Sequence, residues 1–310
     1  MQYLIVGAGG TGGAIGGFLA RAGMNVSIIA RGRHLEAMQE KGLAIETPEE
    51  QFTVHPAAST MEDYMGAPDV IFVCLKGYSL EDAVPFLRRV TGKDTVVIPI
   101  LNIYGTGGRL QKELPDTTVT DGCMYIVSEI KEPGIIRMNG RLFRVVYGLR
   151  RDAAADLRER VMPVLEQVKA DLEQAKIRAV LSEKIEADAL RKFTLISPMA
   201  AIGSAYGTTV RELQEGGAYR ATFQNLIREL MAMAEKQQIP LPKDMAEKNL
   251  ATVDAMAPDS TASMQRDVAA GKPSEADGLV YQVVRTAKSL GVPVPEYEKI
   301  AADLRQRIGR

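Results

Sequence analysis

Residues 2–12 read QYLIVGAGGTG, a short apolar run followed by a glycine-rich loop. The apolar run has the length of a buried strand, and a helical pattern of apolar side chains follows over residues 11–22. The loop therefore matches GxGxxG in the context in which that pattern binds a dinucleotide, between a strand and a helix. The alternative is a glycine-rich turn that binds nothing, which this strand–helix context disfavours.

The chemistry of dinucleotide binding explains the small residues of the loop. The first glycine permits a tight turn, the second lets the backbone approach a pyrophosphate, and the third lets the helix pack closely on the strand. The amino end of the helix adds amide donors and partial positive charge. We therefore expect cofactor contacts from Gly7, Ala8, Gly9, Gly10, Thr11 and Gly12.

The end of the second predicted strand, residues 25–30, distinguishes between the two nicotinamide cofactors. NAD sites place an Asp or Glu there for the ribose hydroxyls, whereas NADP sites offer a cation to the 2′-phosphate. Here the strand is followed by Arg31 and Arg33 and by no acid. Arginine binds phosphate through paired hydrogen bonds, so the sequence favours NADPH, with Arg31 as the expected contact. The alternative is that both arginines are solvated turn residues.

Strand and helix patterns continue to about residue 180. Further apolar strands are predicted over 69–75, 95–101 and 177–181, with a helix over 153–175. Continuous apolar strands joined by helices predict a parallel sheet that is covered on both faces. Residues 134–147 have the pattern of a hairpin, which we expect to extend this sheet in an antiparallel sense.

Helical patterns dominate from about residue 182 onward. They cover residues 183–200, 217–238, 243–255, 261–271, 276–290 and 295–308. The predicted fold class is therefore α/β, with an N-terminal Rossmann-type doubly wound parallel sheet and a C-terminal all-α domain. We expect an NADP-binding domain over residues 1–180 and a helical domain for substrate binding and dimerisation over 181–310.

Composition excludes several classes of function. The chain has 310 residues, which suits two domains, and a net charge of −1, which offers no basic field for nucleic acid or an anionic membrane. The chain contains no run of about 18 apolar residues, so we expect no membrane span. Met231-Ala232-Met233 suits core packing, which is the commoner reason for such residues, or the surface of a homodimer.

The few cysteines and histidines argue against metal chemistry. The chain has two of each, and Cys74 and Cys123 lack CxxC spacing, so we expect neither a disulfide framework nor a zinc site. Reduced thiols and the lack of a recognisable secretory signal predict a cytoplasmic protein.

Reduction of a 2-oxo acid needs a proton donor and a clamp for the carboxylate in addition to hydride. Histidine is the commonest donor, but His34 follows the predicted cofactor arginines and His55 lies in a predicted loop. Lys192 is the leading candidate, because it borders the apolar run 193–196 and half-burial can lower the pKa of a lysine. The alternative is a surface lysine whose stem covers apolar side chains.

Four further polar residues have positions that suit a site. Lys76 and Asn102 each follow a predicted strand, and ligands of open α/β sheets bind beyond the carboxyl ends of the strands. A solvated lysine and a turn-forming asparagine are the alternatives. Ser263 and Glu275 each open a predicted helix, where capping alone would explain both residue types.

Taken together, these segments resemble the ketopantoate reductase (2-dehydropantoate 2-reductase) family nearly from end to end. Beyond the nucleotide loop no single motif is specific, and the resemblance rests on order and spacing. It is carried by Gly7–Gly12, Val73-Cys74-Leu75-Lys76, Asn102 with Gly105, Pro133-Gly134-Ile135-Ile136-Arg137, Arg191-Lys192-Phe193, Ser263-Met264-Gln265-Arg266-Asp267 and Glu275.

The resemblance implies a Rossmann domain and a helical domain with the active site in the cleft between them. It implies NADPH-dependent reduction of 2-dehydropantoate to (R)-pantoate, a step towards pantothenate and coenzyme A. By motif position, Lys192 would be the general acid on the ketone oxygen. Glu275 would hold Lys192 and the substrate in register, and Ser263 would bind the substrate carboxylate. Asn102 would bridge substrate and nicotinamide, and Lys76 would lie near the cofactor, which Glu275 would also contact.

One departure from the family pattern concerns the substrate. Many members carry an asparagine shortly after the catalytic lysine, and this chain has Ile196-Ser197-Pro198-Met199 there. Ser197 is the expected shorter substitute at the substrate, and polar pocket groups set discrimination between close analogues. Another branched 2-oxo acid is therefore an alternative substrate.

Two other classes of protein remain alternatives. A 3-hydroxy acid or polyol dehydrogenase of similar plan would leave the pairing of Ser263 with Glu275 unexplained. A non-catalytic redox sensor that binds NADPH would need the same loop but no acid, so Lys192 distinguishes it from an enzyme.

Overall fold

The computed structural model describes residues 1–309, and these divide into two compact units. The first unit contains Met1–Leu101 and Gly105–Glu186. The second contains the chain from Ala187 onward together with the short segment Asn102–Tyr104. Three residues that follow a strand of the first unit therefore pack as part of the second.

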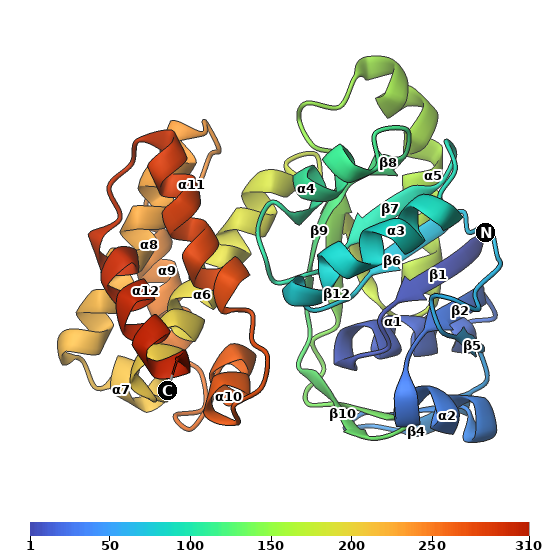
Figure 1. The fold of residues 1–310 in the computed structure, drawn as a ribbon, viewed down its shortest axis with the longest axis horizontal. Coiled ribbons are helices and arrows are strands. Elements are labelled where there is room, and N and C mark those ends of the chain that lie inside the picture. Colours follow the sequence, from blue (N-terminus) through green and yellow to red (C-terminus); the bar gives the residue numbers. More distant parts are fainter. Residues whose placement is uncertain (310) are drawn as a thin grey trace. The chain divides into compact units, whose positions relative to one another are not determined.

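The first unit is built on a six-stranded sheet in which every neighbouring pair is parallel (Figure 1). Its strand order, β5-β2-β1-β6-β7-β8, is the dinucleotide-binding order with one hairpin inserted before the third strand. The strands are β1 (Gln2–Val6), β2 (Asn25–Ile29), β5 (Ala57–Ser59), β6 (Val70–Val73), β7 (Val96–Pro99) and β8 (Thr118–Val119). The helices are α1 (Gly10–Arg21), α2 (Gly32–Lys41), α3 (Leu80–Val90), α4 (Thr106–Glu113) and α5 (Ala155–Gln174).

Both faces of this sheet are buried, as the apolar strands predicted. Alternate side chains of β1 belong to different cores: Tyr3 and Ile5 pack in one, and Leu4 and Val6 in the other. The first core takes apolar residues of α1, α2 and α5, and the second takes those of α3 and α4. The prediction of a doubly wound parallel sheet is confirmed.

The predicted hairpin over residues 134–147 is wrong. Its two halves lie in different small sheets: β11 (Ile135–Met138) pairs with β10 (Ser128–Glu132) and β3 (Leu43–Glu46), whereas β12 (Arg144–Gly148) pairs with β9 (Asp121–Tyr125) and β13 (Arg178–Leu181). A fourth strand, β4 (Gln51–Val54), completes the sheet of β10, β11 and β3.

The error has a physical cause. The turn of the true hairpin is Pro133-Gly134, where Gly134 has φ +80°, and it joins β11 to the strand before it. That strand, SEIKE, is an exposed edge strand, so it lacks the apolar alternation by which strands are recognised.

The second unit is all-helical, as predicted, and is organised around one long helix, α6 (Ile185–Tyr206) (Figure 1). The remaining elements are α7 (Val210–Gln214), α8 (Gly217–Lys236), α9 (Met245–Asp254), α10 (Ser263–Ala269), the π-helical turn η2 (Asp277–Tyr281), α11 (Gln282–Leu290) and α12 (Pro295–Ile308). Fully buried side chains such as Phe223, Leu226 and Tyr297 fill their common core.

The loop after β7 is fixed at its far end by a buried carboxylate. Asp121 accepts a hydrogen bond of 2.9 Å from the backbone N–H of Gly107, in the first turn of α4. Burial raises the pKa of Asp121 to about 6, although the Gly107 amide and Arg150 oppose the rise. A Cβ on Gly107 would lie 2.2 Å from the Thr120 carbonyl oxygen, so only glycine fits at this position.

Within residues 1–309, no helix combines the length and apolarity needed to cross a lipid bilayer. In the same range, no three His, Cys, Asp or Glu side chains are grouped so that they could hold a metal ion. Both cysteines, Cys74 and Cys123, are free thiols.

Candidate active site

The glycine-rich loop has the geometry of a phosphate cradle. Gly7 has φ +106°, in the region that favours glycine, and a Cβ on Gly12 would lie 2.0 Å from the Gly7 carbonyl oxygen. A Cβ on Gly9, by contrast, would meet no described atom within 4 Å. The turn is therefore closed behind the loop and open in front of Gly9, where a pyrophosphate must approach.

The amino end of α1 is also available to an anion. Gly9 is the N-cap, no side chain among the described residues caps it, and the first turn of α1 contains no acid. Its amide groups and helix dipole are thus available to a ligand. These features fit a dinucleotide at the loop.

The second strand leads to the predicted cofactor arginines. Arg31 and Arg33 are both exposed, with Arg31 at the N-cap of α2 and Arg33 within that helix. His34 faces inwards instead, and its Nδ1 accepts a hydrogen bond of 2.9 Å from the Gly134 amide. Burial lowers the pKa of His34, with the Ala8 carbonyl opposing this, so the neutral imidazole adds no charge at the loop. Arg31 and Arg33 are the cations at this end of β2.

Lys76 lies beyond the end of the strand that packs against the loop. A Cβ on Gly7 would lie 2.9 Å from the Cys74 carbonyl oxygen and 3.0 Å from Leu75 Cδ2, so this strand end touches the first loop glycine. Lys76 is the next residue and is half-buried. The fold thus brings Lys76 and the glycine loop to the same edge of the sheet.

The helical unit contains the proton-donor candidate and a hydrogen-bond partner for it. Lys192, half-buried in the first half of α6, donates a hydrogen bond of 2.6 Å from Nζ to Asn102 Oδ1. An amide oxygen accepts without supplying charge, so it orients the amine without forming an ion pair. These two predicted site residues, which are 90 positions apart in sequence, are therefore in direct contact.

Three contacts fix the segment Asn102–Tyr104 on the helical unit. Ile103 packs against Gly278, where a Cβ would lie only 2.3 Å from Ile103 Cδ1. The Tyr104 carbonyl accepts a hydrogen bond of 3.1 Å from Gln282 Nε2. The Tyr104 ring lies 6.1 Å from the ring of Phe193, the neighbour of Lys192 in α6. Asn102 is thus positioned by the unit that carries Lys192.

A π-helical turn provides the seat for Ile103. The turn, Asp277–Tyr281, starts two residues after Glu275, which is only 4% exposed. Such wide turns are rare and often occur at functional sites. Here the turn places Gly278 under Ile103 close in sequence to the predicted site residue Glu275. Ser263, the other C-terminal candidate, is half-buried at the first position of α10.

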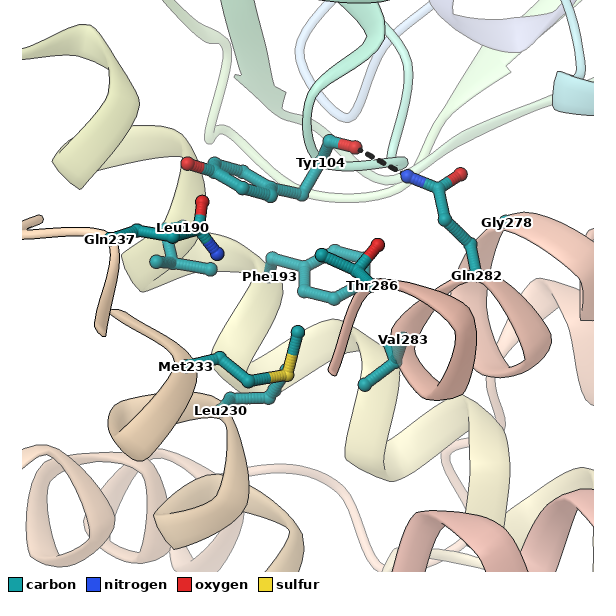
Figure 2. A pocket seen from close by; sticks show the side chains of 10 residues that line it. All are labelled: Tyr104, Leu190, Phe193, Leu230, Met233, Gln237, Gly278, Gln282, Val283 and Thr286. Carbon is teal, nitrogen blue, oxygen red and sulfur yellow. Dashed lines mark hydrogen bonds between the residues drawn. The ribbon is translucent and has the colours of Figure 1, made fainter. Parts of the chain in front are cut away.

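Figure 2 shows a pocket beneath Tyr104, with the Tyr104 and Phe193 rings one above the other and Leu230 and Met233 below. The dashed line in the figure is the bond from Gln282 to the Tyr104 carbonyl. The cavity has a volume of about 30 Å³, which is room for about two water molecules. It is therefore too small for an acid of five or six carbons, and its lining supports the segment that carries Asn102.

Comparison with known proteins agrees with this arrangement. Residues 3–151 match the family model described as ketopantoate reductase PanE/ApbA, and residues 184–307 match the model of its C-terminal domain. The chain belongs to the ketopantoate reductase family. The names of its members identify them as oxidoreductases that act on CH–OH groups. This chain is likewise an oxidoreductase of that class.

Individual relatives cover almost the whole chain. An uncharacterized oxidoreductase, YkpB of Bacillus subtilis, is 28% identical over 308 residues, covering 98% of each protein. A 2-dehydropantoate 2-reductase of Mesorhizobium japonicum is 28% identical over 330 residues, covering 99% of this chain and 97% of the relative. The crystal structure of a PanE/ApbA family ketopantoate reductase from Ralstonia eutropha has a TM-score of 0.89 at 26% identity, covering 100% of this chain and 99% of that one.

Ser197 occupies a different environment from the one we expected within this ketopantoate reductase fold. It is fully buried, and its Oγ donates a hydrogen bond of 2.6 Å to the Leu279 carbonyl. Because its single proton is used there, the Tyr297 hydroxyl at 2.6 Å must be the donor in their contact. Both hydrogen bonds lie in the helical core, so we leave Ser197 out of the proposed substrate site.

Sequence reasoning missed the residues that position Asn102. These residues look like ordinary core and helix residues in the sequence; they are Ile103, Tyr104, Gly278 and Gln282. The one available signal was Gly278, an isolated glycine in a helical pattern, which often marks a close approach of another group. A π turn has no comparable sequence signature.

We predict that Gly278→Ala weakens the seat of the Asn102 segment. Its new Cβ overlaps Ile103, and such overpacking costs about 1–3 kcal/mol of unfolding free energy. Urea unfolding measures this loss. In a double-mutant cycle, Gly278→Ala should cost less stability in the Ile103→Ala background, where the overlap is absent, than in the wild-type protein.

Gly92→Ala is the matched control, since a Cβ there would meet no described atom within 4 Å and the φ of Gly92 is not positive. It should change the stability by less than about 0.5 kcal/mol or raise it slightly. Equal stability of Gly278→Ala and Gly92→Ala would contradict the close packing of Ile103 on Gly278.

Proposed function

We propose that this protein catalyses the NADPH-dependent reduction of the ketone of a branched 2-oxo acid to the 2-hydroxy acid. The reaction suggested by the family and by the relatives' names is reduction of 2-dehydropantoate to (R)-pantoate. The observation that carries the proposal is the hydrogen bond of 2.6 Å from Lys192 Nζ to Asn102 Oδ1. It holds a cationic proton donor at a fixed, partly exposed position.

The glycine loop and Arg31 would hold the cofactor. The space next to Gly9 is open to the pyrophosphate, and the amino end of α1 contributes amide donors. Arg31, exposed at the end of β2, would bind the 2′-phosphate, and Lys76 would add positive charge at the same sheet edge. NADPH, when bound, supplies the hydride to the ketone carbon.

Lys192 would supply the proton. Negative charge develops on the ketone oxygen as its carbon is reduced, and an ammonium at that oxygen stabilises the charge and then transfers a proton from Nζ. Asn102 accepts one hydrogen bond from Nζ, an ammonium group that carries three donors. A redox sensor would have no use for this arrangement.

The remaining candidates would bind and orient the substrate. Ser263, half-buried at the start of α10, would donate its hydroxyl proton to the substrate carboxylate. Glu275, buried next to the π turn, would hold Lys192 and the substrate in register and contribute to the cofactor site. A place in the cytoplasm, a homodimer and a step towards coenzyme A also belong to this proposal, but the chemistry does not depend on them.

One observation favours a second candidate substrate. The hydroxyl of Ser197, expected to replace the family asparagine at the substrate, is turned into the helical core. Another branched 2-oxo acid, with fewer polar groups than 2-dehydropantoate, is therefore a specific alternative.

We predict that Lys192→Ala lowers kcat by about 10²–10⁴-fold, the range for losing a general acid. Steady-state oxidation of NADPH, followed by absorbance with 2-oxo acid substrates, measures it. Lys192→Arg is the matched control, because it keeps the positive charge but has no proton to give near neutral pH. It should be nearly as inactive, while both variants bind NADPH with unchanged affinity. Full turnover by either variant would remove Lys192 from its role.

We predict that Arg31→Ala weakens the binding of NADPH far more than the binding of NADH. Loss of a charge-assisted contact to phosphate costs about 1.5–3 kcal/mol of binding free energy, or roughly 10–150-fold in Kd. NADH lacks the 2′-phosphate, so its binding does not depend on this contact. Fluorescence titration with both cofactors measures the two Kd values. Arg33→Ala is the matched control two residues away. Equal weakening of NADPH and NADH by Arg31→Ala would show that Arg31 does not contact the 2′-phosphate.

A further inference from the structure

The face of α6 that carries Lys192 continues as an apolar stripe. Between residues 192 and 201, every side chain of this helix is buried except those of Lys192, Leu195, Ile196 and Met199. These four occupy positions i, i+3, i+4 and i+7, which lie on one face of a helix, within about 5–6 Å of the next member. We call Leu195, Ile196 and Met199 the apolar stripe.

The apolar stripe packs against the core of the helical unit. All three side chains pack on the core of the helical unit while remaining partly exposed. Farther along α6, a Cβ on Gly203 would lie 2.3 Å from Gln265 Oε1, so α10, the helix that begins with Ser263, is in close contact with the same helix. Lys192 and the apolar stripe therefore lie on one helix, against which α10 packs.

No hydroxyl on this stretch of α6 is available to a ligand. The Thr194 hydroxyl donates to the Arg191 carbonyl at 2.7 Å and accepts from Asn249 Nδ2 at 3.0 Å, inside the core. The Ser197 hydroxyl is used by Leu279 and Tyr297. On the exposed face of α6, the surface that follows Lys192 is thus formed by hydrocarbon and thioether groups.

We propose, on the basis of the function proposed above, that the apolar stripe binds the side chain of the substrate and that the enzyme prefers 2-oxo acids with branched hydrocarbon side chains. When the ketone oxygen is at Lys192 Nζ, the carbon chain attached to the ketone extends along the adjacent turn of α6. A hydroxyl there loses its water and gains no partner from Leu195, Ile196 or Met199. Apolar sites reject an added hydroxyl by at most about 10²-fold, so a preference of about 10–10²-fold follows.

Two ketones test this preference, because they differ by a single hydroxyl. They are 3,3-dimethyl-2-oxobutanoate and 2-dehydropantoate, which is the same molecule with one methyl group hydroxylated. We expect kcat/KM with NADPH to be about 10–10²-fold higher for 3,3-dimethyl-2-oxobutanoate. An equal or higher value for 2-dehydropantoate overturns the inference and leaves the proposed function intact.

Two variants assign the preference to the stripe. Ile196→Asn places a hydrogen-bonding group one helical turn from Lys192, and it should shift the ratio of the two kcat/KM values at least about tenfold towards 2-dehydropantoate. Ser197→Ala is the matched control on the adjacent residue. Its hydroxyl faces the core, so the ratio should stay constant although the melting temperature falls. A shift with Ser197→Ala, or none with folded Ile196→Asn, contradicts the role of the stripe.

A binding measurement separates this inference from the proposed function. Calorimetric titration of the protein with NADP⁺ compares the two product acids, 2-hydroxy-3,3-dimethylbutanoate and (R)-pantoate. Tighter binding of the former without reduction of either ketone supports the stripe and overturns the proposed reaction. Equal or tighter binding of (R)-pantoate overturns the stripe, whatever the turnover.

Discussion

The hydrogen bond from Lys192 to Asn102 is the constraint on which the rest of the site depends. A lysine side chain has many rotamers, and its amine must be held in one place before it can protonate a particular oxygen. The fold meets this need with an amide from a distant part of the chain. Three residues, Asn102–Tyr104, leave the end of a Rossmann strand and pack with the helices, so the amine and the group that orients it belong to one unit.

Several local features serve this one contact. Gly278, a buried residue of the π turn after Glu275, makes room for Ile103, and Gln282 donates a hydrogen bond to the Tyr104 carbonyl. On the other side of the segment, Asp121 holds the first turn of α4. The same helix turns the hydroxyl of Ser197 inwards, and apolar side chains follow Lys192 on the partly exposed face of α6. The position of the proposed acid and the polarity of the proposed substrate site are therefore linked through α6.

Much of this could be predicted from sequence, because the signals were local. The glycine loop, the apolar strands and the helical periodicity each depend on neighbouring residues, and they gave the parallel sheet and the all-α region. What failed depended on partners distant in sequence. The polar edge strand at 128–132 took the place we gave to 144–147, and Ser197 hydrogen-bonds with Leu279 and Tyr297, which no local pattern indicates. The seat of Ile103 on Gly278 is of the same kind.

The most direct test of the central claim is a crystal structure of the protein with NADP⁺ and the 2-hydroxy acid that it produces. The account predicts Lys192 Nζ within about 2.6–3.2 Å of the C2 oxygen, hydrogen-bond reach for a general acid, with Asn102 still accepting from the same amine. A C2 oxygen that contacts another donor, with Lys192 turned away from the ligand, would contradict it.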